Sequence, residues 1–119
     1  MRLTEAEWSV MDALWSGTRF SLKEIAAALV QHNGWSKNTV HTYLTRMEAK
    51  GLVAIDRTQT KPYSAAVSRD FLARWERDQL LNKVYHGAAV DLIAAFLKET
   101  PISQQEASRL RKLLDDMEV

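Results

Sequence analysis

The side chains best suited to bind another molecule lie in a polar stretch between residues 36 and 46. Amide, hydroxyl and imidazole groups can read the edges of DNA bases, and lysine and arginine bind phosphate. On a helix, Asn38, Thr42 and Thr45 share one face, opposite an apolar stripe, and that face carries no carboxylate. We therefore predict a DNA-contacting helix with the following candidate residues: Ser36, Lys37, Asn38, Thr39, His41, Thr42, Thr45 and Arg46.

A second pair of cations, Arg57 and Lys61, lies in a polar, turn-like segment over residues 57–62. This segment separates a β-prone run over 52–55 from a second run over 63–67, which predicts a hairpin with a basic tip. Residues 36–63 contain five Lys and Arg against two Asp and Glu, although the whole chain has a net charge of only +1. A local basic patch of this kind fits a surface for phosphates.

The sequence contains no residue pattern typical of catalysis or of cofactor binding. The four glycines stand at 17, 34, 51 and 87, so no glycine-rich phosphate loop is present. The histidines are scattered and cysteine is absent, so we expect no metal site and no cofactor. A hydrolytic enzyme would need a polar site that this sequence does not supply. We therefore expect a protein that is not an enzyme.

Four helix starts position these residues. Ser or Thr followed three residues later by Glu forms a capping box at Thr4, Ser21 and Ser103, and Ser36 can cap the DNA-contacting helix. We predict helices over 5–15 and 22–32, the second burying Ile25, Ala28 and Leu29, and a third from Ser36 to the glycine at 51. Three helices followed by a hairpin are typical of a winged helix-turn-helix.

The second half of the chain predicts further helices, over about 70–85, then around 90–97, and finally after Ser103. Their apolar stripes are too few to enclose a core within one chain, so we expect a second copy to cover them. The predicted fold is mainly α with a small β-hairpin: a winged helix-turn-helix DNA-binding domain (1–67) followed by a helical dimerisation domain (68–119). The candidate dimerisation residues are Trp75, Val90, Ile93, Phe96, Leu97, Leu110, Leu113 and Met117.

Two further expectations concern the class of protein. The apolar content of 46%, the absence of cysteine and the lack of a long apolar run predict a cytoplasmic protein without membrane insertion. Winged helices also serve as protein–protein interaction modules without DNA binding, and this is the alternative function. Substitution of Arg46 and Lys61 would separate the two, because only a DNA-binding protein should lose its partner.

The sequence resembles the family of penicillinase and methicillin-resistance repressors, which also includes copper-responsive relatives. The resemblance rests on a Glu-Trp-x-Val-Met pattern at 7–11 and a Thr-Val-x-Thr-x-Leu-x-Arg pattern at 39–46. Further matching stretches lie at 3–6, 14–15, 21–25, 50–52, Tyr63 and 81–87, continuing to Phe96. The resemblance implies a homodimeric transcriptional repressor of a palindromic operator in double-stranded DNA.

The same resemblance implies how repression ends. In the antibiotic-resistance members, a membrane sensor protease triggers cleavage of an Asn-Phe bond in the dimerisation tail. The aligned pair here is Ala95-Phe96, which keeps the phenylalanine and lacks the asparagine. Copper-responsive members hold metal with C-terminal cysteines, and this chain has none.

Overall fold

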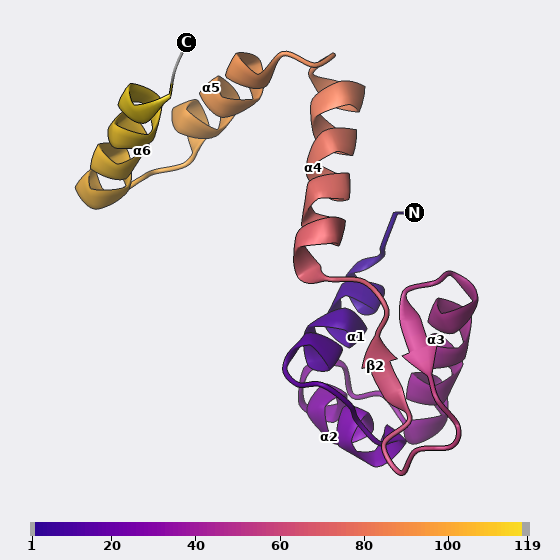
Figure 1. Ribbon diagram of the computed structural model, residues 1–119. Helices are drawn as coiled ribbons and strands as arrows, with labels where there is room; N and C mark the ends of the chain where they lie inside the picture. Colours follow the sequence, from indigo (N-terminus) through magenta and orange to yellow (C-terminus); the bar gives the residue numbers. More distant parts are fainter. Residues whose placement is uncertain (1, 118–119) are drawn as a thin grey trace. The chain divides into compact units, whose positions relative to one another are not determined.

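The computed structural model describes residues 2–117, without the side chains of residues 31–33. Its elements, in chain order, are α1 (Glu5–Trp15), α2 (Leu22–Asn33), α3 (Lys37–Ala49), β1 (Val53–Ile55), β2 (Tyr63–Ala65), α4 (Arg69–Val84), α5 (Ala89–Glu99) and α6 (Gln104–Asp116) (Figure 1). The chain forms two compact units, and the division between Glu76 and Arg77 falls within α4. The expected fold class, mainly α with one hairpin, is confirmed.

All three predicted capping boxes form. At the start of α1, the Glu7 amide donates to Thr4 Oγ1 at 3.2 Å and the Thr4 amide donates to Glu7 Oε1 at 3.0 Å. Ser21 with Glu24 and Ser103 with Glu106 repeat this arrangement at α2 and α6. Gly34 then ends α2 in the left-handed conformation, with φ at +63°, which glycine adopts without the steric cost of a Cβ atom.

The core of the first unit lies between α1, α2, α3 and the hairpin. The apolar stripe predicted opposite the polar face of α3 consists of Val40, Leu44 and Met47, and all three are fully buried in this core. Ile25 and Leu29 of α2 are buried as predicted, but the burial expected for Ala28 is wrong, since its side chain is exposed. Ala28 lies at the edge of the apolar stripe of α2, and no neighbouring element of the described chain covers this edge.

The hairpin pairs β1 with β2 in antiparallel register, with Val53 opposite Ala65 and Ile55 opposite Tyr63. Both strands are shorter than predicted, although one more hydrogen bond joins the flanking residues, from the Ala66 amide to the Leu52 carbonyl at 2.9 Å. The Leu52 amide donates to the carbonyl of Met47 at the end of α3, at 3.0 Å. The carbonyl of Val67 accepts a hydrogen bond from the Trp15 indole at 3.0 Å.

The first part of α4 belongs to the same unit as the hairpin. Ser68 caps this helix by accepting the Phe71 amide at 3.1 Å, and Leu72 is fully buried. Arg69 donates to the Asp12 carboxylate at 2.7 Å, and its guanidinium lies 4.7 Å from the centre of the Trp15 ring. The first compact unit therefore continues beyond residue 67, through the first two turns of α4.

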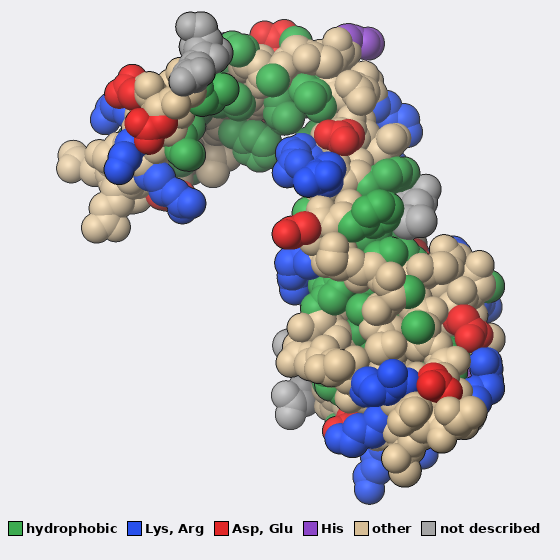
Figure 2. Space-filling model, viewed as in Figure 1, with side chains coloured by type: hydrophobic (Ala, Val, Ile, Leu, Met, Phe, Trp, Pro, Cys, Tyr) green, Lys and Arg blue, Asp and Glu red, His purple; other side chains and the backbone are tan. Residues whose placement is uncertain are grey.

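The apolar side chains of the second unit are largely exposed. Neither α5 nor α6 contains a buried residue, and Val90, Phe96 and Met117 are 76%, 58% and 56% exposed. Figure 2 shows hydrophobic side chains gathered over these tail helices. Among the described residues, no single helix is long and apolar enough to cross a membrane, and α4 with α5 meets that test only as a bent pair.

Candidate nucleic-acid interface

The start of α3 is organised around Ser36. Its hydroxyl oxygen accepts the Thr39 amide at 3.2 Å and lies 3.0 Å from the Thr39 hydroxyl. These two side chains are therefore used mainly to form the helix N-terminus, where free backbone N–H groups and the helix dipole favour an anion. Lys37 is exposed at the same end and adds a positive charge to it.

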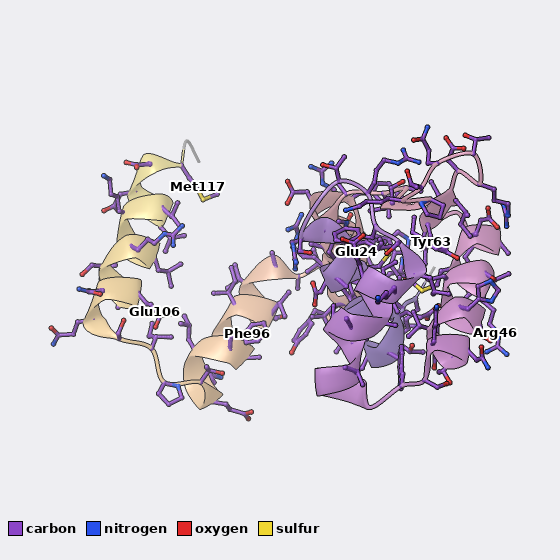
Figure 3. All side chains as sticks on the ribbon, turned by 90° about the horizontal axis from the view of Figure 1, so that it is seen from below. Glu24, Arg46, Tyr63, Phe96, Glu106 and Met117 are labelled. Carbon is purple, nitrogen blue, oxygen red and sulfur yellow. The ribbon has the colours of Figure 1, made fainter. Side chains whose placement is uncertain are left out.

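The outer face of α3 is open to solvent. Asn38, His41, Thr42, Thr45 and Arg46 are all exposed, whereas Thr39 is half-buried. Figure 3 labels Arg46 on this helix. The predicted residues are thus brought together on one surface, except that Thr39 is turned partly into the fold.

The two threonines of this face present only part of their hydrogen-bonding capacity. Thr42 Oγ1 donates to the Asn38 carbonyl and Thr45 Oγ1 donates to the His41 carbonyl, both at 3.0 Å. Each hydroxyl hydrogen is therefore used within the helix, and a methyl group and an acceptor oxygen remain for a ligand. Such a surface suits a thymine methyl or a base amino group better than a phosphate.

The four predicted phosphate-binding cations divide into two pairs. Among residues 2–117, no carboxylate lies within 4.0 Å of the charged group of Lys37 or Arg46. Arg57 instead makes two hydrogen bonds to Glu48, each 3.2 Å long, and Lys61 donates to Glu24 at 3.1 Å. Arg57 and Lys61 of the wing are therefore paired within the chain, whereas Lys37 and Arg46 of α3 are available to an external anion.

The acidic partners of the wing were not predicted from the sequence. The capping-box pattern accounts for Glu24 only at the start of α2, yet Oε1 of Glu24 accepts the Ser21 amide while Oε2 accepts Lys61. These hydrogen bonds, from the Ser21 amide and then from Lys61, lower the pKa of Glu24. Since Glu24 and Lys61 are 37 residues apart, no local pattern could have paired them.

A further cation, Arg19, holds the wing and was also missed. Its Nε donates to the Lys61 carbonyl at 3.1 Å, and its guanidinium lies 3.7 Å from the Asp56 carboxylate. Asp56 accepts hydrogen bonds from the side chain and amide of Thr58, and these lower the pKa of Asp56. The tip of the hairpin is therefore a structured turn attached to the segment before α2.

The position of α3 is secured at both ends. Trp35, which precedes the helix cap, stacks on Tyr43 with ring centres 4.5 Å apart and planes 5° apart. At the other end, Lys50 donates to the buried Glu7 of α1 at 2.7 Å. These contacts hold the outer face of α3 in a defined orientation before any ligand arrives.

Comparison with known proteins identifies the family of this chain. The family model described as penicillinase repressor matches residues 3–116. The chain belongs to the penicillinase-repressor family. This is a family of transcriptional repressors, not of enzymes.

Individual relatives agree with this assignment. The methicillin resistance regulatory protein MecI of Staphylococcus aureus (strain N315) is 30% identical to this repressor over 117 residues, covering 95% of this chain and 93% of MecI. The penicillinase repressor of Staphylococcus aureus is 26% identical over 118 residues, covering 98% and 94%. A solution structure of Bacillus licheniformis BlaI, in its monomeric form with the blaP half-operator, matches with a TM-score of 0.51 and 22% identity. It covers 59% of this chain and 87% of BlaI, which supports the winged-helix fold.

The candidate dimerisation residues of the repressor lie on both units. Trp75 is half-buried on the part of α4 that belongs to the first unit. The others lie on α5, on α6 or, for Met117, directly after α6. Leu110 is half-buried and the rest are exposed: Val90, Ile93, Phe96, Leu97, Leu113 and Met117. Ala95 and Phe96, the candidate cleavage pair, lie within α5 and line an open hollow of about 220 Å³.

Proposed function

We propose that this repressor binds a palindromic operator as a homodimer, with α3 in the major groove of each half-site and the hairpin wing over the adjacent backbone. The observation that carries the proposal is the outer face of α3, where Asn38, Thr42 and Thr45 are exposed and where no carboxylate of residues 2–117 lies within 4.0 Å of the charged group of Lys37 or Arg46. The BlaI neighbour is described as a monomer in complex with a half-operator, which supports operator binding by this fold.

The residues of α3 take two kinds of role in this proposal. Asn38 can bind adenine through its amide, and Thr42 and Thr45 can meet thymine methyl groups or base amino groups. His41 stands beside them and can donate or accept a hydrogen bond. Phosphates are bound by Lys37, by Arg46 and by the start of α3, where the Ser36 cap accepts the Thr39 amide, and these contacts fix the register. Arg57 and Lys61 of the wing contact the neighbouring backbone.

Dimerisation is assigned to the tail. Its exposed apolar side chains on α5 and α6 would be covered by a second copy, and burial yields about 25 cal/mol per Å². A two-fold symmetric protein matches a two-fold symmetric operator because each protomer presents the same helix to one half-site. The two half-site contacts are then linked, which raises the overall affinity.

Disruption of this tail would relieve repression. The aligned cleavage bond, Ala95-Phe96, lies inside α5, so a protease must unwind this helix locally before it can bind the bond in an extended form. Cleavage would separate Phe96, Leu97 and all of α6 from the rest of the tail and remove much of the proposed interface. Cells exposed to a β-lactam, followed by immunoblot and mass spectrometry of the repressor, test this step. A repressor that stays intact while its genes are induced would refute cleavage.

DNA binding and dimerisation are tested together with purified protein. Fluorescence anisotropy should show binding to duplexes from the upstream region of its own gene, with affinity falling steeply as salt rises. Sedimentation should show a dimer at micromolar concentration. No affinity for any duplex at low salt would refute the DNA-binding function, and a monomer that binds DNA would refute only the dimeric form.

A further inference from the structure

Both cations of the wing are held by carboxylates of the same chain. The guanidinium of Arg57 makes two parallel hydrogen bonds to the carboxylate of Glu48, with both distances at 3.2 Å. Lys61 makes one hydrogen bond to Glu24, at 3.1 Å. Glu48 is on α3 itself and Glu24 is in the first turn of α2, so each pair joins the wing to one helix of the helix-turn-helix.

The Arg57–Glu48 pair occupies the donors that a phosphate would use. A guanidinium binds carboxylate and phosphate through the same two-pronged geometry, and the two anions therefore compete for it. The side chain of Arg57 is 68% exposed and that of Glu48 is 32% exposed, so the pair lies at the surface, where such pairs stabilise a fold only slightly. Exchange of Glu48 for a phosphate would therefore disturb the fold little.

The Lys61–Glu24 pair also lies at the surface, and the two oxygens of Glu24 have separate roles. Oε1 of Glu24 accepts the Ser21 amide at 2.9 Å and caps α2, whereas Oε2 accepts Lys61. Glutamine at this position keeps an oxygen for the Ser21 amide and loses the charge that holds Lys61. The electrostatic role of Glu24 can therefore be removed without removing the helix cap.

We propose that Glu24 and Glu48 act as internal phosphate mimics, which mask the wing cations in the free repressor and so suppress its binding to DNA of arbitrary sequence. The proposal rests on the DNA-binding function above and adds specificity-determining residues that do not contact bases. Binding to arbitrary DNA depends almost entirely on cations that displace counterions from phosphates. Of the four phosphate-binding cations proposed above, only Lys37 and Arg46 lack such a mask among the described residues.

Base contacts by α3 would remove this suppression at the operator. Once α3 is seated, a phosphate of the same duplex lies beside the wing at a high effective concentration and replaces the carboxylate. At an arbitrary sequence, α3 does not make these base contacts, and Glu48 and Glu24 remain paired with Arg57 and Lys61. The wing would thus add affinity at the operator and little affinity elsewhere.

The test measures binding of the full-length protein to a random-sequence duplex over a range of salt concentrations. For Glu48→Gln and for Glu24→Gln we expect affinity to rise roughly three- to tenfold, with a salt slope steeper by about one unit, as for one added phosphate contact. Glu5→Gln is the matched control, because Glu5 is exposed on α1 and makes no ion pair within residues 2–117. It should change both quantities much less.

Double variants show whether the gain acts through the wing. In Glu48→Gln/Arg57→Ala and Glu24→Gln/Lys61→Ala, the gain should disappear relative to the Arg57→Ala and Lys61→Ala single variants. A gain that persists would mean general relief of charge repulsion and would overturn the proposal, as would single variants that bind like the parent. A parent protein with no DNA affinity at low salt would instead refute the proposed function itself.

Discussion

The Oε2 atom of Glu7 lies 2.7 Å from the ammonium of Lys50, so the first turn of α1 is joined to the residue that ends α3. Glu7 is only 5% exposed, and its other oxygen accepts the Thr4 amide that begins α1. Burial raises the pKa of Glu7, but the hydrogen bonds from Lys50 and Thr4 outweigh it, and the pKa is lowered overall. One carboxylate thus caps one helix and anchors the end of another.

The first prediction concerns the pH dependence of stability. Because the pKa of Glu7 is lower in the folded than in the unfolded chain, its stabilisation is complete above the unfolded value and is lost as pH falls through the folded value. Glu7→Gln should therefore lower the free energy of unfolding at neutral pH by about 1 kcal/mol and flatten its acid dependence. Urea unfolding at several pH values measures both effects. Equal acid dependence in parent and variant would show that Glu7 contributes nothing to it.

The second prediction separates phosphate contacts from base contacts on α3. Lys37→Ala and Arg46→Ala should weaken binding to all duplexes alike and make the salt slope shallower by about one unit each. Asn38→Ala should keep the slope and reduce the preference for the operator by about 1–3 kcal/mol. Anisotropy titrations with operator and random duplexes distinguish these patterns. An Asn38 variant with unchanged sequence preference would remove this residue from the base-reading set.

The third prediction concerns the tail interface. Phe96 is 58% exposed on α5, and replacement by Asp should dissociate the dimer while leaving the DNA-binding unit folded. Lys98→Asp on the same helix is the control for an added negative charge, because Lys98 is a polar exposed position. Sedimentation reports the oligomeric state, and half-site binding reports the fold of the first unit. A Phe96 variant that remains dimeric at the concentrations of the parent would place the interface elsewhere.

The fourth prediction concerns where the first unit ends. A chain ending at Glu76 retains Leu72, which is fully buried, and Arg69, which pairs with Asp12 at 2.7 Å. A chain ending at Val67 loses both, and the vacated space left by one buried leucine side chain typically costs about 2–5 kcal/mol. We expect the longer fragment to unfold cooperatively and the shorter one to be much less stable. Thermal unfolding of the two fragments provides the comparison, and equal midpoints would contradict it.

The parts of the structure that could be predicted from sequence are those set by neighbours in the chain. The capping boxes at Thr4, Ser21 and Ser103 depend on residues three apart, and each helix begins where its box indicates. The buried stripe of α3 follows from helical periodicity alone. The outer face opposite that stripe could therefore be identified from the sequence alone.

What could not be predicted depends on contacts between distant segments. The masks on Arg57 and Lys61 require the hairpin to fold back toward α3 and α2, so a count of charges along residues 36–63 gave a more basic surface than the fold presents. The second strand was predicted two residues too long, and the Val67 carbonyl at its expected end instead accepts a hydrogen bond from Trp15, 52 positions earlier. The burial of Ala28 was wrongly predicted for a similar reason. Helical periodicity gives the direction of a side chain on α2, but it does not give which neighbouring elements cover that side chain.

All four tryptophans, at positions 8, 15, 35 and 75, lie in the first compact unit, and the tail from Arg77 onward contains none. Intrinsic fluorescence excited at the indole band therefore comes from the first compact unit, where the ring centres of Trp8 and Trp15 are 5.8 Å apart and Trp35 lies beside the start of α3. Circular dichroism records both units because α5 and α6 are helical. Two optical signals without any added label can thus show whether the halves of this repressor melt together or in separate steps.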